Sequence, residues 1–231
     1  MSSKILRTDH FAEDAAALIL TAAREAISAR SLFRLALAGG NTPRIVHAAL
    51  AAAAGPEFPW NHVQITFGDE RCVPPDDADS NFRMAKESLF DSVPIPAGNI
   101  FRIRGEIDPD EAATEYEAKL AAVAARFGEP RYVHDLIILG MGPDGHTASL
   151  FPGQPSLDEA VRNVIPARGP KPPPQRITMT FPLINAARNV CFWVNDATKL
   201  PLVEQIATGD LTYPAARVRP GRQGATWLLA S

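Results

Sequence analysis

The stretch DLIILGMGPDGHTAS, residues 135–149, decides how the rest of the chain is interpreted. Its first six residues form an almost continuous apolar run, which is typical of a strand that a parallel sheet buries on both faces. A glycine-containing loop follows, and such loops often lead from a strand into a helix whose first N–H groups point outward. We therefore expect a buried strand at 135–140 and a loop that begins a helix just after His146.

The same order of apolar run, polar loop and amphipathic segment recurs elsewhere. FRLALA is an apolar run that ends at Gly39 and Gly40, and Pro43 suits the first turn of a following helix. Repeated strand–loop–helix units predict a parallel sheet. The further units are strand 33–38 with helix 42–54, strand 63–67 with polar loop 68–81 and helix 82–90, and strand 189–195 with a helix at about 198–207.

Helical periodicity also marks two segments outside these units, and TWLL, residues 226–229, is consistent with a short last strand. The first segment spans residues of about 10–29. The second is marked by Tyr116, Leu120, Val123 and Phe127. Together these elements predict a single α/β domain, residues 1–231, whose mostly parallel sheet carries helices on both faces in a modified Rossmann-like arrangement.

Composition excludes several classes of partner. The formal net charge of -3 gives no overall basic surface, so we expect neither nucleic acid nor an anionic membrane as a partner. Cys72 and Cys191 lie far apart without metal-ligand spacing, which argues against a disulfide framework and a zinc site. Glu13 and Asp14 stand where a signal peptide would be apolar. We expect a cytoplasmic protein, and the sequence is compatible with a monomer.

A proline-rich segment, PARGPKPPPQR at 166–176, interrupts the pattern. It is too rich in proline for a helix or a central strand, and we expect it to run extended over the surface. Two interpretations stay open. The segment is either a stiff connection between two elements or a wall or lid that brings Arg168, Lys171 and Arg176 to a ligand.

Four loops follow the predicted strands: AGGNTP, GDER, GMGPDGHTAS and NDATK. Ligands of open α/β sheets bind at the carboxyl ends of the strands, so residues of these loops should converge on one site. Arg71, Arg176 and Lys199 supply positive charge there, which suits a small phosphorylated ligand. The Walker pattern and a convincing dinucleotide fingerprint are both missing from the sequence, so a nucleotide is not favoured.

These motifs resemble the 6-phosphogluconolactonases of the pentose phosphate pathway. The resemblance is carried in order by AGGNTPR at 38–44, TFGDERCVPPDDADSN at 66–81, DLIILGMGPDGHTASLFPG at 135–153 and GPKPPPQRITMT at 169–180, followed by the strand before Lys199. Glucosamine-6-phosphate deaminase is similar and shares the DGH core. The continuation HTASLFPG favours the lactonase.

The resemblance implies a site for the substrate phosphate. Its members are Gly39, Gly40, Asn41 and Thr42 together with Arg176 and Lys199. Ala38 and Asn41 stand where the family commonly has serine, and Asp196 stands where glycine is common. Backbone N–H donors at a helix start do not depend on side chains, so we expect phosphate binding to survive these differences.

The resemblance also implies that His146 is the general base, that Arg71 binds and polarises the substrate, and that Asp69 and Asp144 shape the pocket. The chemistry agrees, because lactone hydrolysis needs an activated water, a stabilised oxyanion and a proton for the ring oxygen. None of these requirements calls for a metal or a cofactor. No GxSxG motif is present, so we expect direct attack by water and a packing or hydrogen-bonding role for Ser149 on the following helix.

Simpler roles stay open for several of these residues. Asp144 is also suited to capping the next helix or to holding the turn through its own side chain, and Lys199 to an ordinary position in a first helical turn. Arg71 has carboxylates nearby in sequence with which to pair at the surface: Asp69, Glu70 and Asp76. Cys72 is expected to be a packing residue. Two other functions are considered, a deaminase or isomerase of the same superfamily and a non-catalytic sugar-phosphate sensor.

Overall fold

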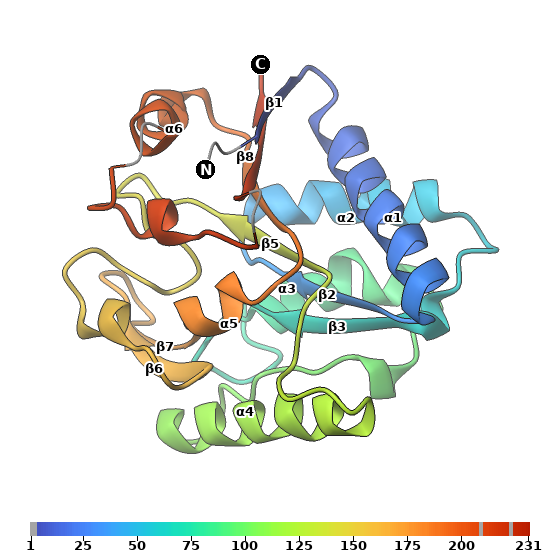
Figure 1. Cartoon of the computed structure of the whole chain (residues 1–231), viewed down its shortest axis with the longest axis horizontal. Helices are drawn as coiled ribbons and strands as arrows, with labels where there is room; N and C mark the ends of the chain where they lie inside the picture. The colour runs from blue at the N-terminus through green and yellow to red at the C-terminus, as the bar shows by residue number, and fades with distance from the viewer. Residues whose placement is uncertain (1–3, 208–209, 222–223) are drawn as a thin grey trace.

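A six-stranded parallel sheet forms the centre of the computed structural model, which describes residues 4–207, 210–221 and 224–231 (Figure 1). The strand order is β1-β9-β8-β5-β2-β3, and every neighbouring pair is parallel. The strands are β1 (Lys4–Thr8), β2 (Phe33–Leu37), β3 (Val63–Phe67), β5 (Leu136–Gly140), β8 (Val190–Val194) and β9 (Thr226–Ala230). The sheet confirms the predicted fold class and every predicted strand, whereas β1 was not predicted.

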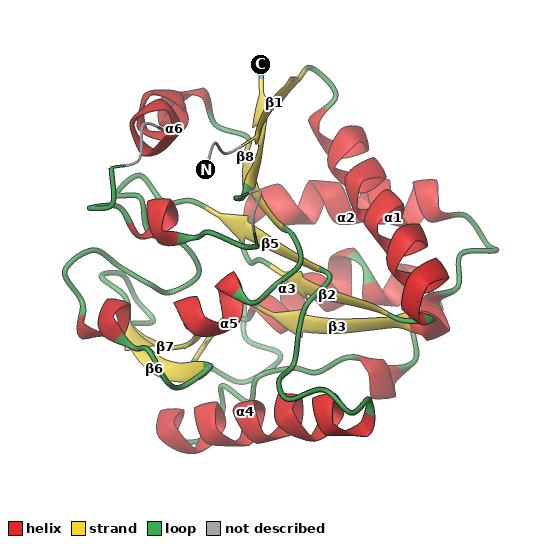
Figure 2. Ribbon diagram, in the orientation of Figure 1, coloured by secondary structure: helices red, strands yellow, loops and turns green. Residues whose placement is uncertain are grey.

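Helices flank both faces of the sheet, with α1 on one side of the β1, β9 and β8 strands and α6 on the other (Figures 1 and 2). The α-helices are α1 (Phe11–Arg30), α2 (Asn41–Ala54), α3 (Asn81–Ser88), α4 (Pro109–Arg126), α5 (Phe181–Asn185) and α6 (Leu200–Ala207). Shorter 3-10 turns are η1 (Trp60–His62), η2 (Phe90–Ser92), η3 (Ala97–Asn99), η4 (Pro155–Asp158), η5 (Ala197–Lys199) and η6 (Pro214–Arg217). Each predicted helix except the one after His146 is confirmed. Phe127 lies just beyond α4 and is 51% exposed, unlike the buried Tyr116, Leu120 and Val123.

The segment after β5 contradicts the prediction, because residues 141–154 form turns and no helix begins at His146. Gly145 and Ala148 have positive φ angles of 75° and 47°. A right-handed helix requires negative φ at every residue, so these two left-handed positions prevent one from forming. The N–H of Gly142 instead donates to the carbonyl of His146 at 2.9 Å, which closes the chain into a compact loop.

A second, antiparallel sheet of order β4-β7-β6 stands beside the main one. Its strands are β4 (Asp69–Arg71), β6 (Val164–Arg168) and β7 (Gln175–Met179). It corrects two predictions: the polar loop at 68–81 contains a strand, and the end of the proline-rich segment lies in the central strand β7. The prolines occupy the β6–β7 turn and the edge strand β6, where no central ladder hydrogen bond is lost.

The core explains why the predicted strands were recognisable. All five residues of β2 and of β8 are buried, as are four of the five in β5. Phe192 on β8 and Trp227 on β9 stack with ring centroids 4.0 Å apart. The sheet is therefore a rigid platform whose strand ends fix the loops that follow. Within the described ranges, no helix has the length and apolar character needed to cross a membrane.

Candidate active site

A cavity of about 520 Å³ lies at the carboxyl ends of β2, β3, β5 and β8. All four loops predicted to converge contribute to its lining. The predicted site residues that line it are Gly39, Gly40, Asn41, Thr42, Asp69, Arg71, His146 and Lys199. Asp144 and Arg176 are not among the lining residues. Asp144 contacts the lining residue His146, and Arg176 contacts the lining residue Lys171. Asn81 lines the cavity without having been predicted as a site residue. Lys171 also lines it, as in the interpretation of the proline-rich segment as a wall or lid.

The first glycine loop presents the start of helix α2 to the cavity. Gly40 is the residue before the helix, with φ at 99°, and among residues 4–207, 210–221 and 224–231 no side chain caps the first turn. The first N–H groups of a 14-residue helix therefore face the cavity region without a capping side chain, which favours an anion there. At Gly39 a Cβ atom would lie 1.9 Å from Oδ1 of Asn81, so only glycine lets the two loops approach this closely.

Arg71 and Lys199 reach the cavity from two other loops. The guanidinium of Arg71 donates to the carbonyl of Asp79 at 2.6 Å and makes no ion pair within the described part of the chain, so the surface pairing considered above does not occur. Nζ of Lys199 donates to the carbonyl of Met141 at 2.9 Å and lies 4.0 Å from a carboxylate oxygen of Asp196. Both side chains thus carry positive charge that neighbouring carboxylates neutralise weakly or not at all.

Arg176 lies opposite Arg71 in the β4–β7 ladder and is only 8% exposed. Burial and the charge of Arg71 lower the pKa of Arg176, although an arginine side chain stays protonated in proteins. One of its terminal nitrogens donates to the carbonyl of Lys171 at 3.4 Å, and the other is buried without a hydrogen-bond partner among the described residues. Arg176 therefore lies beneath the proline-rich turn, behind the cavity wall.

Asp69 is the carboxylate nearest to the cavity, and two neighbours hold it. Oγ of Ser149 donates to Asp69 at 2.6 Å, and Nδ2 of Asn81 donates to its carbonyl at 2.9 Å and to its carboxylate at 3.3 Å. Ser149 thus has the hydrogen-bonding role that was predicted, but from a turn rather than from a helix. Asn81 could have been predicted as a site residue from the sequence, because it ends the polar loop that carries Arg71 and begins α3.

Glu70 fixes the loop that carries these residues. Its buried carboxylate accepts hydrogen bonds from the backbone N–H groups of Arg71 (2.8 Å), Asn81 (2.7 Å) and Phe82 (2.8 Å). Burial raises the pKa of Glu70, and these backbone donors act in the opposite direction. The carboxylate joins the end of β4 to the start of α3, so Arg71 and Asn81 are held at fixed positions in the cavity wall.

Two contacts hold the ring of His146, one at Nδ1 and one by ring packing. Nδ1 lies 2.5 Å from Oδ1 of Asp144, and the ring packs on Phe151 with centroids 4.5 Å apart. A Cβ atom on Gly142 would lie 2.1 Å from the imidazole, so this glycine makes room for the ring. Since Asp144 occupies Nδ1, Nε2 is the nitrogen left for a ligand in the cavity.

Asp144 is set up to remain ionised beside His146. Burial alone would raise the pKa of Asp144, but the hydrogen bond and charge of His146 outweigh it, and the pKa lies below its usual value. Its Oδ1 also accepts from the backbone N–H of His146 at 3.2 Å. The alternative role of capping a following helix does not apply, because the chain enters turns directly after His146. The other alternative, holding the turn through its own side chain, agrees with this backbone hydrogen bond.

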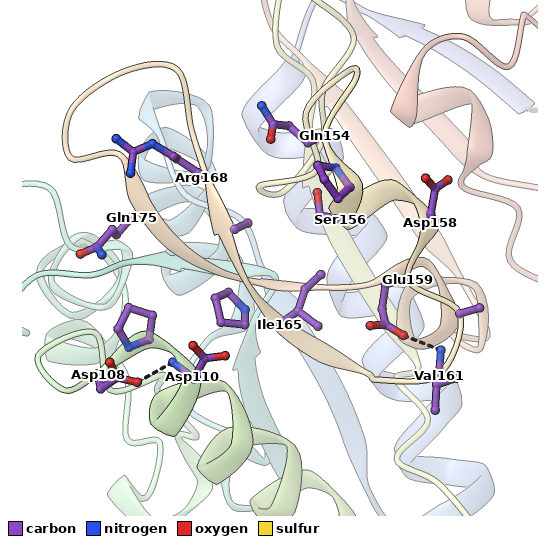
Figure 3. A pocket seen from close by; sticks show the side chains of 15 residues that line it. Asp108, Asp110, Gln154, Ser156, Asp158, Glu159, Val161, Ile165, Arg168 and Gln175 are labelled. Carbon is purple, nitrogen blue, oxygen red and sulfur yellow. Dashed lines mark hydrogen bonds between the residues drawn. The ribbon is translucent and has the colours of Figure 1, made fainter.

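A larger cavity, of about 840 Å³, lies between the start of α4, η4 and strand β6 (Figure 3). Its carboxylates are Asp108, Asp110, Asp158 and Glu159, and Arg168 lies at one side. Asp108 caps α4 and Glu159 accepts from the N–H of Val161, so two of the four already have partners. None of the predicted site residues lines it. Across the described residues, no group of three or more His, Cys, Asp or Glu side chains is placed to hold a metal ion.

Comparison with known proteins supplies the family context for this geometry. A family model described as glucosamine-6-phosphate isomerases/6-phosphogluconolactonase matches residues 7–227. The chain is 40% identical over 206 residues to the 6-phosphogluconolactonase of Homo sapiens, covering 87% of this chain and 79% of the relative. It is 40% identical over 217 residues to the 6-phosphogluconolactonase of a Nostoc species, covering 92% and 88%.

Solved structures are similar over almost the whole chain. The crystal structure of 6-phosphogluconolactonase from Thermotoga maritima superposes with a TM-score of 0.87 at 30% identity, covering 99% of this chain and 100% of that one. A monomeric glucosamine-6-phosphate deaminase superposes with a TM-score of 0.80 at 18% identity, covering 98% and 97%, which shows a shared fold.

Proposed function

Because the chain belongs to the family of glucosamine-6-phosphate isomerases and 6-phosphogluconolactonases, we propose that it is a lactone hydrolase. Its reaction is the hydrolysis of 6-phospho-D-glucono-1,5-lactone to 6-phospho-D-gluconate in the oxidative pentose phosphate pathway. The relatives at about 40% identity that carry this name support the substrate. We also propose that residues 1–231 act as one domain, in the cytoplasm and as a monomer, on a small molecule rather than on nucleic acid or a membrane.

One observation carries the proposal: a histidine–carboxylate pair stands at the edge of a cavity with excess positive charge. Arg71, Lys171 and Lys199 line the cavity, and Asp69 is the only carboxylate among its described lining residues. Unpaired cations close together repel one another unless an anion is bound. The phosphate of a sugar phosphate supplies that anion, and the start of α2 adds backbone donors to it.

The proposed reaction begins at His146. Nε2 takes a proton from a water molecule as the oxygen of that water attacks the lactone carbonyl carbon. Arg71, which lines the same cavity, stabilises the oxyanion that forms. When the tetrahedral intermediate collapses, the bond between the carbonyl carbon and the ring oxygen breaks, and the imidazolium returns its proton to that oxygen. Water and the ester thus become a carboxylic acid and an alcohol.

Asp144 supports both proton transfers in this scheme. It accepts the Nδ1 proton of His146, which fixes the tautomer with Nε2 free to act as a base. Its negative charge also stabilises the imidazolium between the two transfers. Every step uses protein groups and water, so the proposal requires no metal and no cofactor.

The test is hydrolysis of freshly generated 6-phosphogluconolactone, recorded against its spontaneous opening and repeated with EDTA present. We expect acceleration that EDTA does not change, and much weaker acceleration with glucono-1,5-lactone, which lacks the phosphate. Equal rates with the two lactones would show that the cavity does not recognise the phosphate. No acceleration with either would exclude the lactonase, and conversion of glucosamine 6-phosphate would then identify a deaminase.

A further inference from the structure

The turn between β6 and β7 is a short proline-stiffened hairpin at the cavity wall. Residues 169–174 read GPKPPP, and the N–H of Gly169 donates to the carbonyl of Pro174 at 2.7 Å. Proline fixes φ, so four prolines around one lysine leave the backbone of this turn little freedom. The hairpin therefore holds Lys171 at a defined place.

Lys171 lines the active-site cavity, and its side chain makes no hydrogen bond or ion pair with any described residue. Its backbone is held instead, because its carbonyl accepts from Arg176 at 3.4 Å. Arg176 is itself buried behind the wall, and its second terminal nitrogen has no partner in the part of the chain that the structure describes. The free positive charge that this segment presents to the cavity thus belongs to Lys171, whereas Arg176 supports the turn that carries it.

We propose that Lys171 binds the phosphate of the substrate and that Arg176 is a positioning residue, which holds Lys171 through its backbone carbonyl. This inference rests on the proposed function and deepens it by assigning a substrate contact to the hairpin. A lysine ammonium offers three donors and a compact charge on a flexible stem, which suits a phosphate that enters and leaves with each turnover. Of the two interpretations left open by the sequence, the geometry supports the wall.

Arg168 on the same segment provides a matched control. Arg168 lines the larger cavity of Figure 3, and it shares a third cavity of about 530 Å³ with Lys171, but only Lys171 also lines the active-site cavity. Arg168 carries the same charge at a distance of three residues along the chain. If the hairpin acts only through its general charge, Arg168 and Lys171 should matter equally.

The experiment compares Lys171→Met with Arg168→Met on 6-phosphogluconolactone and on the phosphate-free lactone. Loss of a charge-assisted hydrogen bond should raise KM of Lys171→Met for the phosphorylated lactone about 10-fold or more. For the phosphate-free lactone, kcat/KM of Lys171→Met should stay as in wild type. Arg168→Met should have wild-type KM and kcat for both lactones. An unchanged KM in Lys171→Met, or an equal rise for both lactones, would overturn the assignment.

Arg176→Lys tests the positioning role. It should raise KM for the phosphorylated lactone, and the double variant with Lys171→Met should be no worse than Lys171→Met alone, because both changes remove the same contact. Additive effects would show that Arg176 binds substrate independently and would contradict the positioning role.

Binding of 6-phosphogluconate, measured by calorimetry, separates this proposal from the proposed function. If wild type shows no turnover but binds 6-phosphogluconate, the lactonase fails, and about 10-fold weaker binding by Lys171→Met still supports the phosphate contact. If wild type neither turns over nor binds, both proposals fail.

Discussion

Two glycine loops that look alike in sequence have different structures. AGGN at 38–41 and GMGPDGH at 140–146 follow β2 and β5, which are neighbours in the sheet. After β2 the chain enters helix α2 directly, whereas after β5 it turns back on itself and forms no helix before η4. The first loop exposes backbone donors, and the second positions a side chain.

The glycines differ accordingly. Gly39 lets Asn81 approach the backbone, and Gly40 adopts a positive φ immediately before the helix. Gly142 makes room for the imidazole of His146, and Gly145 makes room for Tyr213, which would lie 2.6 Å from an added Cβ. We infer a division of roles between the two loops: the loop after β2 binds the anion, and the loop after β5 positions the side chain that transfers protons.

Among substitutions that leave the His146 side chain in place, the largest effect is expected from Gly142→Ala. The new methyl group would lie 2.1 Å from the His146 ring, so the imidazole must move. A displacement of about 1 Å at a reacting group lowers kcat roughly 100-fold, while KM should change little. Steady-state kinetics check this. Gly98→Ala is the matched control, because its Cβ would meet nothing within 4 Å, and it should behave as wild type.

Asp144→Asn should have the next largest effect. It removes the charge that fixes Nδ1 of His146 and stabilises the imidazolium, and losing one charge-assisted hydrogen bond lowers kcat about 10- to 100-fold. Affinity for 6-phosphogluconate should persist. A variant that retains wild-type kcat would show that Asp144 has only a structural role in the loop.

Gly39→Ala tests the other loop. Its methyl group would lie 1.9 Å from Asn81, which must shift together with the start of α2. Weaker phosphate binding should raise KM about 10-fold with a smaller change in kcat. If Gly39→Ala instead lowered kcat as strongly as Gly142→Ala, the division of roles between the loops would be wrong.

The smallest effect concerns stability. Each loop belongs to a unit with a buried histidine: His47 lies in α2, and His134 lies just before β5 and contacts Thr66 of β3. Burial lowers the pKa of His47 to about 4 and of His134 to about 3, and nearby arginines add to both shifts.

As the pH falls, these histidines become protonated at a higher pH in the unfolded chain than in the folded one. Between pH 6.5 and about 4, the free energy of unfolding should therefore fall with decreasing pH by about 1.4 kcal/mol per pH unit for each histidine. Urea unfolding at pH 6.5, 5.5 and 4.5 measures this slope. The slope of His134→Asn should be shallower than that of wild type, and an identical slope would show that His134 is not buried in its neutral form.

The parts of the fold that could be predicted are those whose residues carry their own signal. Strands β2, β5 and β8 are apolar runs because the sheet buries them on both faces. β1 lies at the sheet edge with mostly exposed residues, and β4 has only three residues, so neither shows a recognisable pattern. Pairing with distant strands defines both of them.

The candidate site divides in the same way. His146, Arg71 and Lys199 were predictable because they lie in loops that follow recognisable strands. The burial of Arg176 was not, since it depends on β7 and on the hairpin that covers it. The absence of a helix after His146 could not be predicted either, because Ala148 adopts a left-handed conformation that is uncommon for alanine.

Turnover and affinity of His146→Ala, measured side by side, test whether His146 transfers the proton without contributing to anion binding. We expect kcat to fall by at least about 100-fold, while the dissociation constant for 6-phosphogluconate, from calorimetry, stays within about twofold of wild type. A variant that keeps near wild-type kcat would remove His146 from the mechanism. A variant that loses affinity together with turnover would contradict the separation of proton transfer from anion binding.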